Sequence, residues 1–527
     1  MKRLALIGLF LIFILGFYLR VMYLPQNALT FGYDQARDAI NALQIVHGHL
    51  KIQGPPASQP GLFHGVLYYY VLAPAYLLGH GSPIIAAYWI AFINSLTILL
   101  VFYLTYLFAK KQKVANVYIP ALVASLLYAI SFEATQYATW MSNPTIAIFT
   151  VPLMYLGLWI WINNDSSKLI NKIAPVIAAV GLGFSIQAEI FLLYHIVPLL
   201  IWLWIGRKNI SKKQLITFIL ILLLSLSSMI VNEVKFGFRS IAGFSQLVTG
   251  ADPNLAYAKS IGDYLILYLN QIGRIFAFNS YPGNIGVAGG FVIILALIGI
   301  FKPKNTTSKI NPYVFLATWL FSHVTVVSVG GTSTPFLMVG IGPAVSILIA
   351  MYLYNWWNSD GSDKNAKYFG CAISILVLGV IIFGNLKFIT RENKNGSTLF
   401  SIQKDMLLSK QLSVVDYTYE KSSGDKFSIN TLTSPLWINI VWDYLYKWYG
   451  QNKYGYTPQW HGRDQIGQLG GLEETSLDTK KYFLILEPMA GIPVQYLDLT
   501  IGEENTKSRS IEEKNWGELR VQYRTKI

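Results

Sequence analysis

The sequence predicts a mostly α-helical, polytopic membrane protein with about 11 transmembrane helices, an inside N-terminus and a small extracytoplasmic α/β domain at the C-terminal end. Three observations lead to this fold class. The 527 residues are 53% apolar and only 13% charged, whereas soluble domains carry about 25% charged residues. Long apolar runs recur up to about residue 388. Lys and Arg gather in alternate turns between these runs.

The first apolar run follows Lys2 and Arg3 and lacks a small-residue cleavage site, so we interpret it as an uncleaved helix and not as a signal peptide. Further spans are expected at 84–108, 118–132, 144–162, 173–187, 190–206, 214–234, 286–301, 312–329, 334–356 and 368–388. The basic residues of alternate turns are Lys110, Lys111, Lys113, Lys168, Lys172, Arg207, Lys208, Lys212, Lys213, Lys302, Lys304, Lys309, Lys364 and Lys367.

The turns expected on the other side, 133–143 and 330–333, contain no Lys or Arg. Cytoplasmic loops carry the excess of basic residues, so this alternation places the N-terminus inside. An odd number of spans then places the C-terminus outside, together with the loop that follows the first span.

Two domains are predicted. Residues 1–388 form the transmembrane domain, with long outer loops at 25–83 and 235–285, and residues 389–527 form the extracytoplasmic domain. The loop 235–285 contains amphipathic stretches that we expect to lie in the interface plane. In the last domain a helical pattern near 398–420 precedes the strand-like segments FSINTLTS and KYFLILEP. Its aromatic cluster is either core and interfacial packing or a surface for lipid or sugar.

Composition also argues against several functions. The net charge of +14 is typical of cytoplasmic loops in a membrane protein, and no nucleic-acid-binding motif accompanies it. The single cysteine, Cys371, permits neither an intrachain disulfide nor a cysteine-based metal site. No nucleotide-binding or hydrolase motif occurs in a supporting context.

The outer loop after the first span contains the candidate chemistry. Asp34, Arg37 and Asp38 are spaced i, i+3 and i+4, so a helix places all three on one face. Asp34 lies near the start of that helix, where a carboxylate caps free amides. Alternatively, an aspartate just beyond the outer end of a span reaches a lipid-borne substrate and accepts the proton of an acceptor hydroxyl.

Further candidates follow along the chain. The segment QPGLFHGVLYYYVLAP predicts a turn and an apolar, tyrosine-rich helix that is too short to span. His64, at its polar start, is either a phosphate or sugar contact or a solvated, interfacial histidine. Glu189 lies between two apolar runs, where an acid is costly and therefore a functional candidate; the alternative is an interfacial carboxylate in a turn. His47 and His49 would point apart on a helix, which disfavours metal binding.

These segments resemble the GT-C type membrane glycosyltransferases, in the protein O-mannosyltransferase and aminoarabinose transferase-like superfamily. The resemblance is carried by GYDQARDA directly after the first span, QPGLFHGVLYYYVLAP later in the same loop, and WMSNPT before the fourth span. The expected plan of 11 spans, with an inside N-terminus and an outer C-terminal domain, is also similar.

The resemblance implies an enzyme that transfers a hexosyl or pentosyl group from a polyprenyl-phosphate carrier to a protein, lipid or glycan acceptor, with inversion, on the extracytoplasmic side of the plasma membrane. The catalytic acid of the family's outer loop falls on Asp34, and Arg37 takes part of the phosphate-binding role. The other residues expected to contact substrate or phosphate are Asp38, His64, Gln59, Glu189 and Tyr68, the last on the helix that binds the prenyl chain.

Two departures from the family pattern leave metal dependence open. Many members have Asp-Glu where this chain has Asp34-Gln35, and an acid or Lys where it has Gln59. No cofactor is therefore assigned, and a divalent metal stays an open alternative. The same departures keep a non-catalytic family member under consideration. A lipid or sugar transporter or flippase is the other alternative, but it predicts an internal repeat, and none is visible.

Overall fold

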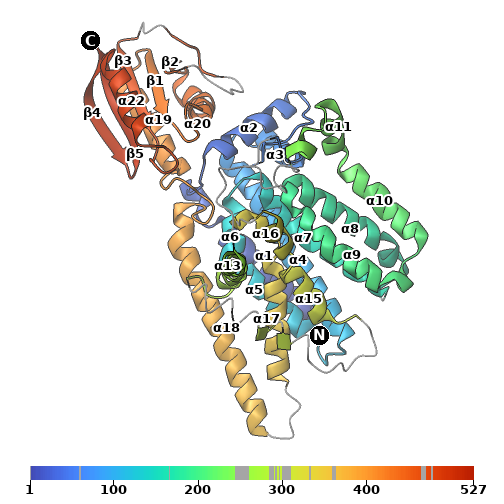
Figure 1. Cartoon of the computed structure of the whole chain (residues 1–527). Coiled ribbons are helices and arrows are strands. Elements are labelled where there is room, and N and C mark those ends of the chain that lie inside the picture. Colours follow the sequence, from blue (N-terminus) through green and yellow to red (C-terminus); the bar gives the residue numbers. More distant parts are fainter. Residues whose placement is uncertain are drawn as a thin grey trace.

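Apolar helices form most of the chain, and one five-stranded sheet lies near its C-terminal end (Figure 1). The computed structural model describes residues 2–57, 61–164, 166–243, 260–283, 290, 294–295, 297–298, 310–330, 334–358, 364–463, 471–475 and 479–527.

Five helices within the described residues are long and apolar enough to cross a membrane, and two bent helix pairs raise this number to as many as seven. Large apolar side chains on their surfaces, such as Leu4 (73% exposed) and Phe10 (63%), face outward, as expected for a multi-pass membrane protein in lipid. The five helices are α1 (Lys2–Val21), α4 (Pro83–Lys111), α7 (Ala147–Asn163), α8 (Lys168–Ala188) and α18 (Lys364–Glu392).

The bent pairs are α5 (Tyr118–Ala129) with α6 (Phe132–Thr139), at 52°, and α10 (Lys212–Ser225) with α11 (Ser227–Lys235), at 56°. The predicted total of 11 spans and the inside N-terminus remain predictions, and most of the predicted span 286–301 lies outside the described residues. Shorter helices and turns are η1 (Leu24–Gln26), η2 (Asn143–Ile146), η3 (Ile190–His195), α9 (Ile196–Ile205), η4 (Arg207–Asn209), α15 (Pro312–Leu320), α16 (Val324–Gly330), η5 (Pro335–Met338), α17 (Gly342–Trp357) and η6 (Asn393–Asn395).

Small residues allow the central helices to approach closely. A Cβ added at Gly181 would lie 2.4 Å from the backbone nitrogen of Met154, and one added at Gly157 would lie 2.5 Å from that of Ala178. Both contacts join α7 to α8. Small residues at helix crossings are the common packing solution in membranes, because lipid removes the hydrophobic drive for association.

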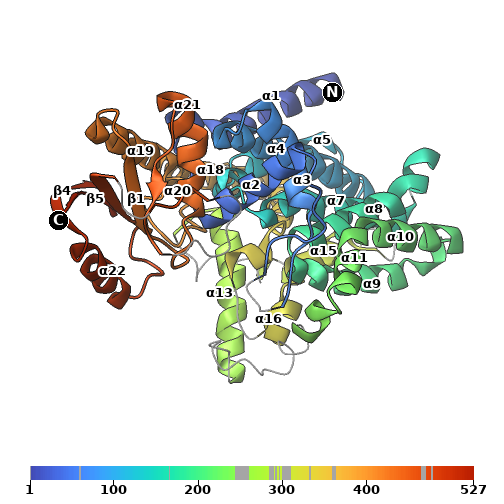
Figure 2. The ribbon, with the colours of Figure 1, turned by 90° about the horizontal axis from the view of Figure 1, so that it is seen from above.

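Two helices of the loop that follows α1, α2 (Tyr33–Val46) and α3 (Leu67–Leu78), lie at the same end of the helical body as the C-terminal domain, while the N-terminus lies at the opposite end (Figure 1). Helix α13 (Ile261–Asn279) is seen end-on in Figure 1 and lengthwise in Figure 2. Helix α18, by contrast, is seen lengthwise in Figure 1. Helix α13 therefore lies crosswise to α18, and its place in the interface plane stays a prediction.

The sheet has strand order β2-β1-β3-β5-β4. Strand β1 (Phe427–Leu432) is parallel to β2 (Gln459–Trp460) and β3 (Lys481–Leu486), and β5 (Leu519–Lys526) is antiparallel to β3 and β4 (Ser508–Trp516). The sheet is accompanied by α19 (Leu408–Ser422), α20 (Ile440–Leu445), the π-helix η7 (Tyr446–Gly450), α21 (Gln451–Tyr454) and α22 (Gln495–Asn505).

Extended backbone joins the outer loop to the C-terminal domain. The Phe31 amide donates to the Met406 carbonyl at 3.0 Å, and the Leu408 amide donates to the Leu29 carbonyl at 2.8 Å. The buried Gln411 side chain donates to the Phe31 carbonyl at 2.7 Å. These contacts fix the start of α2 against the start of α19.

Candidate active site

The first turn of α2 is capped by Gln35 and not by Asp34. The helix begins after Gly32, and the Gln35 side-chain oxygen accepts from the Gly32 amide at 2.9 Å. This bond is the one that the third residue of a helix makes in a capping box. Asp34 lies in the first turn, where its negative charge interacts favourably with the helix dipole. Its carboxylate bonds Arg37 and does not cap the helix.

Arg37 joins the two acids of α2. Its Nη1 lies 2.7 Å from Asp34 Oδ1, and its Nη2 and Nε lie 2.7 Å and 2.8 Å from Asp38 Oδ1. The three side chains share one helix face, as their spacing predicts. Their exposure differs sharply: the Asp34 side chain is 48% exposed, that of Arg37 is 9% exposed and that of Asp38 is fully buried. Asp34 is therefore the most accessible of the three to solvent and ligands, Arg37 is reached only at its edge, and Asp38 is sealed.

The Asp38 carboxyl lies against α3. Its Oδ2 has no hydrogen-bond partner within the described part of the chain, and the hydroxyl of Tyr68, also buried, has none either. Burial raises the pKa of Asp38 to about 7, although Arg37 offsets part of the rise. Tyr68 is completely buried beside this carboxyl, so its ring does not reach the lipid surface.

His64 and Glu189 meet although 125 positions separate them in the sequence. His64 Nδ1 accepts from the Ile190 amide at 3.2 Å and lies 3.6 Å from Glu189 Oε1. Burial lowers the pKa of His64 to about 3, with a further contribution from Arg37. Burial raises the pKa of Glu189, in the connection between α8 and η3, to about 8. Both side chains are neutral at pH 7, so this contact is not an ion pair, and Nε2 of His64 carries the proton.

The turn containing His64 is docked on the end of α8. The Gly65 amide donates to the Gln187 carbonyl at 2.8 Å, and the Leu67 amide donates to the Gln187 side chain at 3.2 Å. Gly54 closes the other side of the turn, because an added Cβ would lie 2.2 Å from the Gly65 carbonyl oxygen. The candidate Gln59 lies outside the described residues.

A second buried acid, Glu133, belongs to a network that sequence reasoning identified only in part. The Asn279 side chain donates to Glu133 at 2.6 Å and accepts from Ser131 at 2.6 Å. Arg274, on α13, lies within electrostatic range of Glu133 and of Tyr137. The sequence marks Glu133 as an acid near a membrane end, but Asn279 is 146 positions away and carries no local signal.

The described residues do not form a cation site at this place. No group of three His, Cys, Asp or Glu side chains gathers among them. The carboxylates of Asp34 and Asp38 are bonded to one guanidinium, which opposes a divalent cation between them. His47 and His49 are both exposed on the surface.

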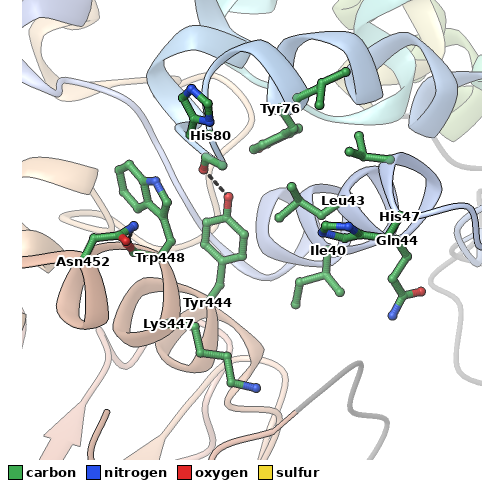
Figure 3. Close-up of a pocket in the computed structure, with 13 residues that line it drawn as sticks. Ile40, Leu43, Gln44, His47, Tyr76, His80, Tyr444, Lys447, Trp448 and Asn452 are labelled. Atoms are coloured by element: carbon green, nitrogen blue, oxygen red, sulfur yellow. Dashed lines mark hydrogen bonds between the residues drawn. The ribbon is translucent and has the colours of Figure 1, made fainter. Parts of the chain in front are cut away.

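A cavity of about 510 Å³ opens on another face of α2, between α3 and the aromatic helix of the C-terminal domain (Figure 3). Its walls include Ile40 and Leu43 from α2, Tyr76 from α3, and Tyr444 and Trp448 from the C-terminal domain. The Tyr444 hydroxyl donates to the Gly81 carbonyl, which ties the two walls together.

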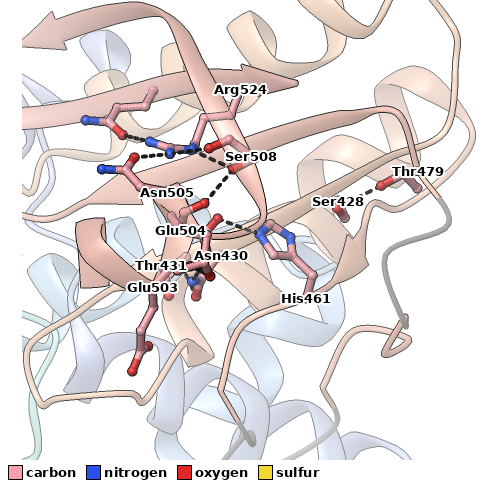
Figure 4. Close-up of polar contacts among 12 residues, drawn as sticks. Ser428, Asn430, Thr431, His461, Thr479, Glu503, Glu504, Asn505, Ser508 and Arg524 are labelled. Atoms are coloured by element: carbon pink, nitrogen blue, oxygen red, sulfur yellow. Dashed lines mark hydrogen bonds and ion pairs between the residues drawn. The ribbon is translucent and has the colours of Figure 1, made fainter. Parts of the chain in front are cut away.

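The C-terminal domain holds a separate polar cluster behind its sheet (Figure 4). His461 Nε2 lies 3.3 Å from Glu504, and the Asn430 side chain donates to Glu504 at 2.7 Å. Burial alone would raise the pKa of Glu504, but the hydrogen bonds with His461 and Asn430 and the nearby positive charges together outweigh it, and the net pKa is lowered. Nearby, the buried Arg524 bonds Ser508. These contacts fix α22 to the sheet.

The sequence matches no protein-family model and no curated protein sequence. Its structure is similar to ArnT from Cupriavidus metallidurans bound to undecaprenyl phosphate, with a TM-score of 0.57 at 11% identity over 99% of this chain and 98% of that chain. The chain has a GT-C type glycosyltransferase fold. ArnT in the apo state gives a TM-score of 0.55 at 10% identity over the same shares.

An oligosaccharyltransferase from Archaeoglobus fulgidus is also similar, with a TM-score of 0.47 at 12% identity over 83% of this chain and 63% of that chain. The GT-C fold confirms the resemblance at the level of the fold, while the number of spans and their orientation stay predictions. At these identities the similarity concerns the fold, and the roles of individual residues rest on the geometry above.

Proposed function

We propose that this protein is an integral-membrane glycosyltransferase. It moves a hexosyl or pentosyl group from a polyprenyl-phosphate carrier to an acceptor on the outer face of the plasma membrane, where its C-terminal domain also lies. The proposed carrier belongs to the same chemical class as undecaprenyl phosphate, the ligand in the ArnT structure.

One observation supports this proposal above all: the accessible Asp34 carboxylate is held by Arg37 at the end of the helical body that carries the C-terminal domain. In a GT-C fold, a carboxylate there meets a substrate whose hydrocarbon tail lies in the bilayer and whose sugar projects from it. A base must lie within hydrogen-bond reach of the proton that it removes.

The proposed reaction is a single displacement. The acceptor oxygen attacks the anomeric carbon, a new carbon–oxygen bond forms, and the bond between that carbon and the carrier phosphate oxygen breaks. Its electron pair leaves on the phosphate, and Asp34 takes the acceptor proton. One displacement inverts the anomeric centre.

The neighbouring groups position the base and the leaving phosphate. Arg37 uses one N–H toward Asp34 and two toward Asp38, and its side chain also bonds the Tyr69 hydroxyl, so one N–H is left for a phosphate oxygen. Neutral His64, within electrostatic range of Arg37, offers its Nε2–H as a further donor. Stabilising the departing phosphate lowers the barrier because charge accumulates there in the transition state.

Transport of a lipid-linked sugar is the second candidate function. The two bent helix pairs favour it, because interrupted helices are typical of transporters. The buried Glu133 lies in one of those pairs. The half-exposed Asp34 favours the transferase, since a transport site is expected within the bilayer and not at its edge.

The test uses the full chain in liposomes with radiolabelled polyprenyl-phosphate sugars and a delipidated envelope fraction as acceptor. The transferase predicts label covalently attached to the acceptor, with the anomeric configuration inverted. Label that crosses the bilayer but stays on the carrier would identify a transporter. Label that does neither would identify a non-catalytic protein.

A further inference from the structure

The cavity of Figure 3 lies apart from the Asp34–Arg37 face, although both are built on α2. Residues 40, 43, 44 and 46 of α2 and the adjoining His47 line it, whereas residues 34, 37 and 38 form the other face. At about 510 Å³ it is in the range of small-molecule sites.

We infer that this cavity binds a saccharide portion of the acceptor substrate. The inference rests on the proposed function only in assigning the saccharide to the acceptor; the binding itself follows from the walls of the cavity.

Aromatic rings provide the apolar part of the site. Tyr444 and Trp448 lie 6.3 Å apart with an angle of 27° between their planes, and both border the cavity. Tyrosine and tryptophan combine a broad apolar face with a polar edge. A sugar ring has the matching form, since one face presents C–H groups and its rim carries hydroxyls.

Polar side chains surround these rings. Gln44 and Asn452 contribute amides, and His47, His80 and Lys447 contribute nitrogen donors; no carboxylate is among the residues that line the cavity. Lys447 also donates to the Gly471 carbonyl at 2.7 Å, so its ammonium is directed along the rim. Donors of several kinds around an apolar floor suit a ligand with many hydroxyls better than a hydrocarbon chain.

Tyr76 adds a third aromatic side chain to the wall. It is 1% exposed and its hydroxyl is sealed from solvent, so its ring, and not its hydroxyl, borders the cavity. Tyr76 also lies within electrostatic range of Asp38, which links the cavity to the acids of α2.

The cavity is preformed. Gly81 adopts φ +84°, and a Cβ there would lie 2.9 Å from the Trp448 ring, so the α3–α4 turn is pressed against that ring. Its walls come from the loop after α1 and from the C-terminal domain, at the end of the helical body where that domain lies. This position suits an acceptor arriving from outside and not the hydrocarbon carrier.

The test measures binding of the full chain in detergent to an immobilised panel of short gluco-, manno-, galacto- and N-acetylglucosamine oligosaccharides. Trp448→Ala is expected to lower affinity about tenfold, and Asn452→Ala, at an exposed position that cannot disturb folding, is expected to lower it less. Trp516→Ala, in the same domain but on β4, is the matched control and should bind as the unmodified chain does.

The Asp34→Asn variant separates this inference from the proposed function. It should bind the same oligosaccharides normally while losing transfer. Absence of binding to every member of the panel, or equal binding by Trp448→Ala and Trp516→Ala, would overturn the saccharide site and leave the transferase intact. Loss of flotation with phosphatidylglycerol vesicles in Trp448→Ala, without any change in oligosaccharide binding, would assign the cavity to lipid instead.

Discussion

Two aspartates one turn apart occupy opposite environments in this protein. Asp34 is half-exposed, Asp38 is fully buried, and Arg37 bonds both. Two carboxyl groups in different surroundings are a common basis for dividing catalytic roles. The exposed carboxylate is free to meet substrate, while the buried one holds the guanidinium in place.

The burial of Asp38 predicts a pH-dependent stability. Its pKa is raised from 3.8 to about 7 in the folded chain, so the folded state binds more protons than the unfolded state between these values. Stability from this group is therefore full below about pH 4 and is lost as the pH rises through 7. Asp38→Asn, which resembles the protonated acid, should flatten the decline in melting temperature from pH 5 to pH 8.

Burial also raises the pKa of Asp443 and Glu487 to about 7 and that of Glu189 to about 8, so the Asp38→Asn chain keeps part of the slope from them. The difference between the two chains isolates Asp38. Identical slopes with and without the substitution would show that Asp38 does not titrate in this range.

At the scale of single residues, the sequence predicted what depends on local spacing. The i, i+3, i+4 pattern placed Asp34, Arg37 and Asp38 on one face, and the structure has them there. It did not predict the contact of His64 with Glu189, because that contact depends on how a turn docks on a distant helix end. Nor did it predict that Gln35 would replace Asp34 as the cap.

At the scale of elements, the turn between α2 and α3 positions the candidate site. It is held on α8 through Gln187, and the close approach of Gly54 to Gly65 leaves no room for a side chain. Gly54 and Gly65 are therefore needed because a side chain would not fit, and not because their backbone angles are unusual.

Gly54→Ala should displace this turn, because the new Cβ would meet backbone atoms at 2.2–2.5 Å and backbone does not yield cheaply. We expect a destabilisation of about 1–3 kcal/mol, together with faster proteolysis in the loop 47–66 and reduced transfer. Thermal melting and limited proteolysis measure these effects.

Gly379→Ala is the control, since nothing lies within 4 Å of its added Cβ in helix α18. It should be neutral or slightly stabilising, because Ala favours a helix over Gly by about 1 kcal/mol. Equal behaviour of the two variants would contradict the docked turn.

Element positions were largely predictable, but their ends were not. The apolar run 84–108 corresponds to α4, and the tyrosine-rich segment corresponds to α3. The helix expected near 398–420 begins instead at Leu408. The preceding residues bond to distant partners, with the Ser397 amide donating to Thr30. Tertiary contacts of this kind override a local helical pattern.

At the scale of the whole molecule, Gln136 couples the helical body to the C-terminal domain. This completely buried side chain donates to Asn393 at 2.7 Å and to the Gly396 carbonyl at 3.1 Å, and it accepts from the Leu399 amide at 3.0 Å. Gln136 therefore fixes residues 393–399, and the backbone of residues 29–31 fixes residues 406–408 next to them.

Gln136→Ala should leave several buried groups without partners, which costs about 1–3 kcal/mol for each unsatisfied group. The melting temperature of the chain in detergent should fall clearly. Gln495→Ala removes the same amide at an exposed position of α22 and should change stability by no more than about 0.5 kcal/mol. Similar melting temperatures of both variants would show that the hydrogen bonds of Gln136 do not stabilise the protein.

The sequence predicted the mostly helical membrane class and the α/β end of the chain because both depend on composition and periodicity. The segment 133–143, predicted as a turn, instead contains most of helix α6, which is bent by 52° from α5. The bend between α10 and α11 was not predictable, since an apolar run reads the same whether straight or broken. The cavity between α2 and Tyr444 was equally inaccessible, because its walls are about 400 positions apart.

The central claim is that Asp34 accepts the acceptor proton during glycosyl transfer. Its most direct test is the rate of radiolabelled sugar transfer from polyprenyl phosphate by the Asp34→Asn chain in liposomes, compared with Asp498→Asn, an exposed aspartate of α22. We predict that Asp34→Asn lowers the rate by about 10²–10⁴-fold, with unchanged protein level and melting, while Asp498→Asn transfers normally. Undiminished transfer by Asp34→Asn would contradict the account.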